Sequence, residues 1–79
     1  MTYQNHVARL YKERGYTDKI EILALGLCEE AGEVCAAILD MSPEFKAKPG
    51  RAKSDLEHEL HDCLTYLCAI ANAAGIQLI

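Results

Sequence analysis

The sequence predicts an all-α fold, and three features of its 79 residues carry this prediction. Apolar residues recur at the three- and four-residue spacing of amphipathic helices, capping and terminating residues flank those stretches, and no stretch alternates like a β-strand. The hydrophobic content of 51% is too high for a disordered chain. We expect a single domain over residues 1–79, without internal repeats or linkers.

The first two predicted helices are delimited by residues suited to helix ends. The first spans residues 3–14, with Thr2 as a suitable N-cap. The second spans residues 18–41, where Asp18-x-x-Glu21 resembles a capping box and Pro43 interrupts the apolar run. This second helix is apolar on nearly every side, so we expect it to need covering by more than two neighbouring helices.

The third predicted helix spans residues 54–74. Ser54 and Glu57 form an S-x-x-E capping box, while Gly15 and Gly75 are suitable left-handed terminators for the first and third helices. We expect the two longer helices to form an antiparallel hairpin beside the N-terminal helix. Oligomerisation would then complete a four-helix-type bundle.

Composition excludes several classes of partner. Twelve acidic against eight basic residues give a net charge of −4, opposite to the footprint of a nucleic-acid-binding protein. Residues 22–39 resemble a membrane span, but Glu29, Glu30 and Glu33 make insertion too costly, and we expect no membrane partner. The four cysteines form no CxxC pair and follow no signal peptide, which favours reduced thiols at buried helical positions in a cytoplasmic protein.

Glu30 occupies an unusual position for a carboxylate. On a helical wheel of about 100° per residue, Leu23, Val34 and Ala37 fall within roughly 40° of it. An ionised carboxylate on such an apolar face requires hydrogen bonds or a cation. Solvation at the protein surface therefore does not explain Glu30.

Glu59 and Asp62 form a second acidic stripe on the third predicted helix. In an antiparallel hairpin, a rise of about 1.5 Å per residue brings the Glu30–Glu33 and Glu59–Asp62 pairs to similar heights. Facing carboxylates repel one another, and neither stripe has the Lys or Arg neighbours of a salt-bridged helix surface. Oxygen-only ligands suit Mg²⁺ or Mn²⁺, so we predict a metal site formed by Glu30, Glu33, Glu59 and Asp62.

An iron site is a weaker alternative. Asp55-x-x-His58 imitates the Glu-x-x-His motif of di-iron helical bundles, but residues 18–41 contain no matching Glu-x-x-His.

The coordination of a carboxylate-bound Mg²⁺ ion is commonly completed by phosphate oxygens, which favours a phosphorylated substrate.

The connection between the two longer helices carries half of the basic residues. Two prolines and a glycine predict a surface loop there, and we expect its cations to hold a polyphosphate: Lys46, Lys48, Arg51 and Lys53. A solvated loop without a binding role stays open as an alternative.

The segment Glu29-Glu30-Ala31-Gly32-Glu33, followed after twenty-five residues by Glu59-Leu60-His61-Asp62, resembles a known signature. It is similar to the E-E-x-x-E and E-x-x-D motifs of MazG-like nucleoside triphosphate pyrophosphohydrolases. The flanking segments, Leu27–Ala37 and Glu59–Leu78, follow the pattern of that family as well.

This resemblance implies that the acidic helices bind Mg²⁺ and that a (d)NTP is cleaved to the monophosphate and pyrophosphate. It also implies a homodimer or homotetramer, a role for Glu29 in orienting the attacking water, and a substrate contact at Asn72. Tyr66 is a candidate for stacking on the nucleobase, with packing as the alternative. MazG-like proteins often continue into a further helix with Lys and Arg that closes over the substrate, whereas this sequence stops at Ile79. A neighbouring subunit is therefore an alternative source of phosphate-binding charge.

We expect a housekeeping enzyme that acts on non-standard nucleotides. Two alternatives remain open. One is a phosphoribosyl-ATP pyrophosphohydrolase-like enzyme, whose usual GEEA and EAADLLYH motifs are less similar to this sequence. The other is a non-catalytic helical module for oligomerisation or regulation.

Overall fold

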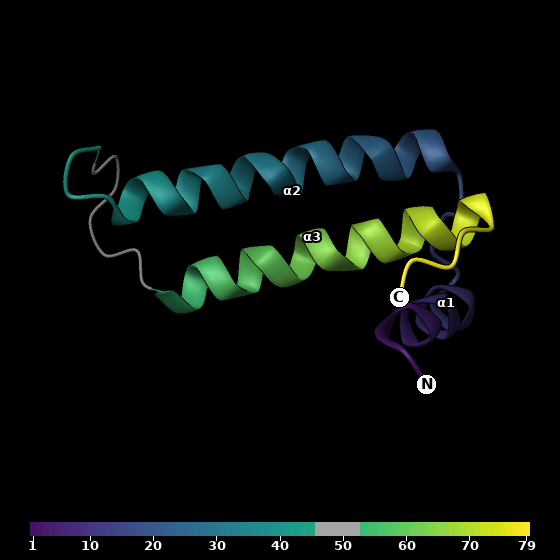
Figure 1. Cartoon of the computed structure of the whole chain (residues 1–79). Helices are drawn as coiled ribbons and strands as arrows, with labels where there is room; N and C mark the ends of the chain where they lie inside the picture. The colour runs from purple at the N-terminus through teal and green to yellow at the C-terminus, as the bar shows by residue number, and fades with distance from the viewer. Residues whose placement is uncertain (46–52) are drawn as a thin grey trace.

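The computed structural model describes residues 1–45 and 53–79, except the side chain of Ser54. Within these residues the chain forms three helices and no strand: α1 (Tyr3–Arg14), α2 (Ile20–Met41) and α3 (Lys53–Ala74). Figure 1 shows α2 and α3 side by side and antiparallel, with α1 against the C-terminal half of α3. The all-α prediction is confirmed. None of the described helices combines the length and apolar character that crossing a membrane requires.

The predicted ends of α1 are correct. Thr2 Oγ1 accepts a hydrogen bond of 3.1 Å from the Asn5 N–H, as an N-cap residue does. Gly15 ends the helix in the left-handed conformation, with a φ of 65°, and Gly75 follows α3 with a φ of 72°. Both glycines therefore stand where a side chain would strain the backbone.

The predicted start of the second helix at Asp18 is wrong by two residues. The helix begins at Ile20, and its N-cap is Lys19, which makes no side-chain capping bond. The Lys19 N–H instead donates to Thr17 Oγ1 at 3.1 Å. This local turn competes with helix formation and keeps residues 17–19 outside α2. The predicted cap at Ser54 lies outside the described side chains.

The core is small and lies where α1 and α2 meet α3. Partly buried aromatic and aliphatic side chains surround it. The buried cluster itself consists of four residues: Val7, Leu23, Cys68 and Ala69. Cys68 is buried as expected, but Cys28 and Cys35 are exposed and Cys63 is half-buried. The prediction that all four cysteines occupy buried positions is therefore wrong for the single chain, because the described elements leave much of α2 uncovered.

Gln4 fastens the C-terminal residues to α1. Its side chain is 2% exposed, and its Nε2 donates to Asn72 Oδ1 at 3.0 Å and to the Ile76 carbonyl oxygen at 2.6 Å. Its Oε1 accepts from the N–H groups of Leu78, at 2.7 Å, and Ile79, at 3.0 Å. Both donors and both lone pairs of the amide are thus used, which makes its burial tolerable.

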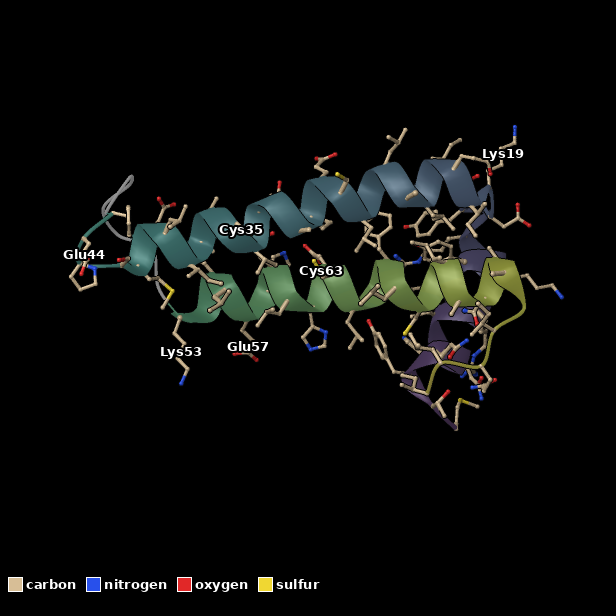
Figure 2. All side chains as sticks on the ribbon, turned by 45° about the horizontal axis from the view of Figure 1, so that its top comes forward. Lys19, Cys35, Glu44, Lys53, Glu57 and Cys63 are labelled. Carbon is tan, nitrogen blue, oxygen red and sulfur yellow. The ribbon has the colours of Figure 1, made fainter. Side chains whose placement is uncertain are left out.

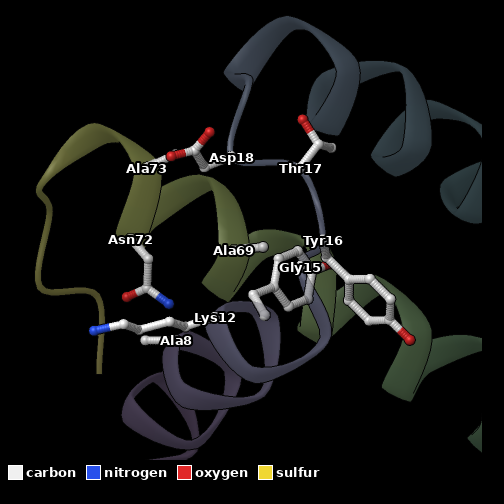
Figure 3. A pocket seen from close by; sticks show the side chains of 10 residues that line it. Ala8, Lys12, Gly15, Tyr16, Thr17, Asp18, Ala69, Asn72 and Ala73 are labelled. Atoms are coloured by element: carbon white, nitrogen blue, oxygen red, sulfur yellow. The ribbon is translucent and has the colours of Figure 1, made fainter.

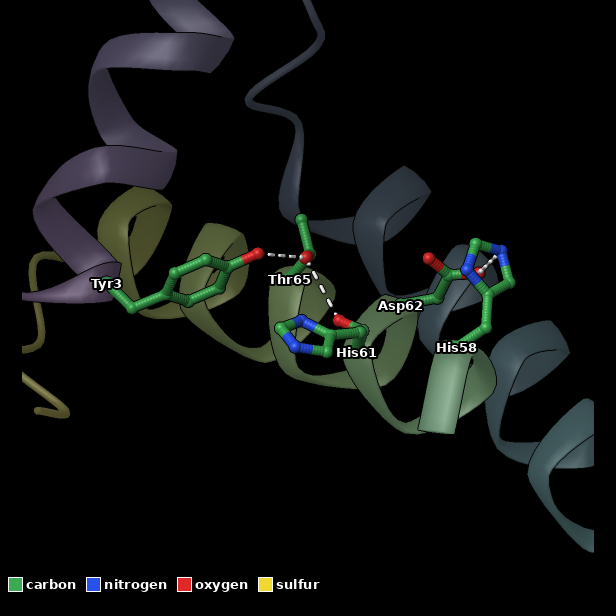
Figure 4. A network of polar contacts seen from close by, with 5 residues as sticks. All are labelled: Tyr3, His58, His61, Asp62 and Thr65. Carbon is green, nitrogen blue, oxygen red and sulfur yellow. Dashed lines mark hydrogen bonds and ion pairs between the residues drawn. The ribbon is translucent and has the colours of Figure 1, made fainter. Parts of the chain in front are cut away.

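A second polar contact joins α1 to the middle of α3. The Tyr3 hydroxyl lies 2.8 Å from Thr65 Oγ1, which donates to the His61 carbonyl oxygen at 3.0 Å (Figure 4). Because Thr65 uses its hydroxyl hydrogen for that second bond, Tyr3 is the donor in the first. The N-terminal helix is therefore held to α3 at two heights.

Gly26 allows α2 and α3 to approach closely. A Cβ atom at this position would overlap the ring of Tyr66 on α3. Gly26 precedes Glu30 by about one helical turn, and Tyr66 follows Glu59 by about two turns. The separation of the helices beside the acidic residues thus depends on the missing side chain.

We expect Gly26→Ala to be less stable than Gly32→Ala by about 1–3 kcal/mol, the usual cost of overpacking. Both substitutions gain about 1 kcal/mol of helix propensity, but a Cβ at Gly32 meets nothing within 4 Å. The difference between the two variants in chemical denaturation therefore isolates the contact with Tyr66. Equal free energies of unfolding would contradict the proposed spacing role of Gly26.

Candidate metal centre

Three glutamates from the facing helices converge. Glu30 and Glu33 on α2 and Glu59 on α3 each place one carboxylate oxygen within 4.8 Å of the others. We call these residues the glutamate cluster. Figure 2 labels two cysteines close to them in sequence: Cys35 follows Glu33 by two residues on α2, and Cys63 follows Glu59 by four residues on α3. The antiparallel register expected from the helical rise is therefore the one that brings these carboxylates together.

The cluster favours protons at two of its members. Burial raises the pKa of Glu30 above the ordinary 4.5, and the negative charges of Glu33 and Asp62 raise it further. The pKa of Glu59 is raised first by a hydrogen-bond contact with Glu33, and then by burial and by neighbouring charges. Each of these effects disfavours the ionised carboxylate. The charge of His58 acts in the opposite direction on Glu59, but the net shift of both pKa values is upward.

Two oxygen atoms of the cluster fit a cation ligand role. Glu30 Oε2 and Glu59 Oε2 are buried and have no hydrogen-bond partner among the described residues. Burying a carboxylate oxygen without a donor is costly, and a divalent cation would satisfy both atoms at once. The donors are all hard oxygens, which matches the ligand preference of Mg²⁺ and Mn²⁺.

Asp62 is close to the cluster but does not belong to it. Its charge raises the pKa values of Glu30 and Glu59, yet its oxygens are not among those that lie within 4.8 Å of one another. Its Oδ2 lies 3.4 Å from Nε2 of His58, one turn earlier on α3. The structure thus brings together three of the four predicted ligands and leaves the fourth beside a histidine.

The other residues predicted around the metal are exposed or outside the described residues. Glu29 is exposed on α2, next to Glu30 in sequence but outside the cluster. Lys53 is exposed at the first position of α3, at the end of the hairpin where Figure 2 also shows Glu44. The remaining basic residues of the connection lie outside the described part of the chain: Lys46, Lys48 and Arg51.

Tyr66 and Asn72 have structural contacts of their own. Tyr66 packs over Gly26 and against the core. Asn72 accepts a hydrogen bond from Gln4 and donates from Nδ2 to the Gln4 carbonyl oxygen at 3.1 Å. It also lines a hollow of about 510 Å³ between α1, α3 and the residues that follow Gly15 (Figure 3). Asn72 lies about 15 Å beyond Asp62 along α3 by helical rise, well away from the cluster.

Sequence reasoning missed the roles of three residues near the cluster. The Cys63 thiol has a pKa raised by burial and then by the charges of Glu30, Asp62 and Glu59, which places it beside the carboxylates. The other two residues are Gly26 and His58. Their positions in the sequence were the available signal, since Gly26 lies one turn before Glu30 and His58 lies one turn before Asp62. Their one-turn spacing puts each on the same helix face as its acidic neighbour.

Comparison with known proteins identifies one family. No curated protein and no solved structure matches the chain significantly. The family model for the MazG nucleotide pyrophosphohydrolase domain matches residues 18–78, a range that contains the two longer helices and all of the predicted metal ligands. The match leaves α1 outside. The chain belongs to the MazG nucleotide pyrophosphohydrolase family.

Proposed function

We propose that this protein is a divalent-metal-dependent enzyme that hydrolyses (d)NTPs to the monophosphate and pyrophosphate, acting on non-standard nucleotides. The glutamate cluster, with two buried oxygens that lack donors, is the observation that carries this proposal. Membership of the MazG family supports the reaction class. The cytoplasmic location expected from the cysteine pattern of the sequence is part of this proposal.

The proposed cation is Mg²⁺ or Mn²⁺, and the proposed ligands are Glu30, Glu33, Glu59 and Asp62. When bound, the cation would neutralise phosphate charge and activate water. The glutamates come from rigid helices rather than loops, so their oxygens are held in place before a substrate arrives. Burial around Glu30 strengthens its attraction for a cation.

Glu29 is the proposed residue for orienting the attacking water, because its carboxylate is an acceptor next to Glu30 on α2. The departing pyrophosphate needs positive partners. The sequence of α2 contains no Lys or Arg, and that of α3 contains only Lys53. We therefore assign this task to three basic residues between the helices and to the first residue of α3: Lys46, Lys48, Arg51 and Lys53.

Substrate contacts at Tyr66 and Asn72 remain proposals. The packing of Tyr66 against Gly26 leaves at most part of its ring for a base. The distance of Asn72 from the cluster along α3 favours a contact in an assembly over one within the same chain. For both residues, helix packing already accounts for the side-chain position.

We expect Glu30→Gln to remove the stabilisation by Mg²⁺ or Mn²⁺ without destabilising the metal-free protein. A carboxyl with a raised pKa contributes stability below its ordinary pKa, and that stability is lost as pH rises through the raised value. The metal-free wild type should therefore lose stability between mildly acidic and neutral pH, and Glu30→Gln should lose less. Thermal melts with and without metal, at both pH values, measure this.

The matched control for this experiment is Glu57→Gln, which changes an exposed carboxylate on α3 (labelled in Figure 2) that does not belong to the cluster. It should respond to metal like the wild type. A Glu30→Gln protein that melts far below the wild type without metal, and is still stabilised by Mg²⁺, would count against the site.

A panel of nucleotides assayed with Mg²⁺ tests the reaction. We expect each hydrolysed triphosphate to yield its monophosphate and pyrophosphate, and Glu59→Gln to lower kcat/KM by at least about a hundredfold. Release of orthophosphate and a diphosphate would overturn the reaction assignment. Turnover of phosphoribosyl-ATP alone would identify the related enzyme of that specificity, and metal binding without any turnover would favour a non-catalytic module.

The surface of the single chain supports assembly. Its accessible area is 5645 Å², against about 4,700 Å² for a compact monomer of 8.7 kDa. The excess is close to the roughly 800 Å² that each partner buries in a standard interface. Large apolar side chains are exposed along both longer helices, among them Ile22, Leu25, Ile38, Leu60 and Leu67. We propose a homodimer or homotetramer that pairs these helices in a four-helix-type bundle.

Sedimentation should show a concentration-dependent oligomer of the wild type, and Leu25→Glu should shift it toward the monomer. Leu25 is 73% exposed in the single chain, so a charge there costs little unless a partner buries it. Leu78→Glu changes an equally apolar exposed residue away from α2 and serves as the control. A folded wild-type monomer at all concentrations would refute the assembly.

A further inference from the structure

Asp62 differs from the glutamates in the group that its carboxylate contacts. It lies one turn after Glu59 on α3, and its charge acts on both Glu30 and Glu59. Its Oδ2 nevertheless lies 3.4 Å from Nε2 of His58, one turn back toward the start of α3. Figure 4 shows the imidazole and the carboxylate facing each other along the helix. The contact is thus made through Oδ2 of Asp62.

Packing does not explain the position of His58. Its side chain is 74% exposed, so the ring buries little surface against the protein. The nearby His61 behaves differently, because its ring stands edge-on to Tyr3 of α1 with centroids 6.2 Å apart. Along the sequences of α2 and α3 the only Lys or Arg is Lys53, at the far end of the hairpin. His58 therefore places a ring nitrogen, positively charged when protonated, beside the Asp62 carboxylate.

A carboxylate that ligates a metal commonly has its second oxygen held by an outer donor, which fixes the direction of the ligating oxygen. We propose that His58 is a positioning residue, which holds Oδ2 of Asp62 so that Oδ1 can complete the cation site formed by Glu30, Glu33 and Glu59. This inference rests on the proposed metal site. It assigns His58 no contact with the cation or the substrate.

Calorimetric titration of the 79-residue protein with Mn²⁺ tests the role without relying on activity. We expect His58→Ala to weaken Mn²⁺ binding by about tenfold or more. His58→Gln should recover most of the affinity, because its amide N–H can reach the same carboxylate. His61→Ala is the matched control on the same helix and should bind like the wild type.

The double variant His58→Ala/Asp62→Asn shows whether His58 acts through Asp62. We expect it to bind Mn²⁺ no more weakly than Asp62→Asn alone, since residues that act as one unit have non-additive effects. A further loss of similar size in the double variant would overturn the proposal, because His58 would then act independently of Asp62.

Two other outcomes would also overturn it. If the wild type binds Mn²⁺ and His58→Ala binds equally well, the positioning role fails while the metal site stands, even if the variant melts at a lower temperature. If the wild type does not bind Mn²⁺, the metal site and the role of His58 fail together.

Discussion

The close approach of α2 and α3 is the constraint on which the rest of the structure depends. Apolar packing brings the two helices together, and Gly26 lets the ring of Tyr66 lie against the backbone of α2. The same approach forces Glu30 and Glu59 into proximity. The pKa of Glu30 is raised first by burial, and that of Glu59 first by its hydrogen-bond contact with Glu33. Folding energy is thereby used to bring together carboxylates whose ionised forms repel one another. Such a conflict between packing and charge is typical of functional sites.

The division of chemistry between elements follows from this arrangement. The carboxylates proposed as cation ligands lie within long helices, where the hydrogen-bonded backbone limits the movement of the residues that carry them. Positive charge is absent from the same helices beyond Lys53. A hydrolytic reaction on a polyphosphate needs both signs of charge, so binding of the leaving group has to be contributed by a different part of the chain or by another subunit.

Sequence periodicity predicted the three helices and placed Glu30 on an apolar face. Helical rise then predicted the register in which Glu30 meets Glu59, because rise and packing direction are nearly independent of side-chain detail. The contact of Asp62 with His58 was not predictable in this way, since a side-chain rotamer depends on local donors. The exposure of Cys28 and Cys35 was missed because periodicity identifies apolar faces without showing what covers them.

The bonds of Gln4 have a consequence for the dynamics of the chain ends. The N–H groups of Leu78 and Ile79 belong to exposed residues and would ordinarily exchange their hydrogens with solvent quickly, yet both donate to the buried amide of Gln4. Their exchange therefore requires either release of the C-terminal residues or undocking of α1 from α3. Hydrogen exchange at these two N–H groups accordingly reports how often the two ends of the chain separate.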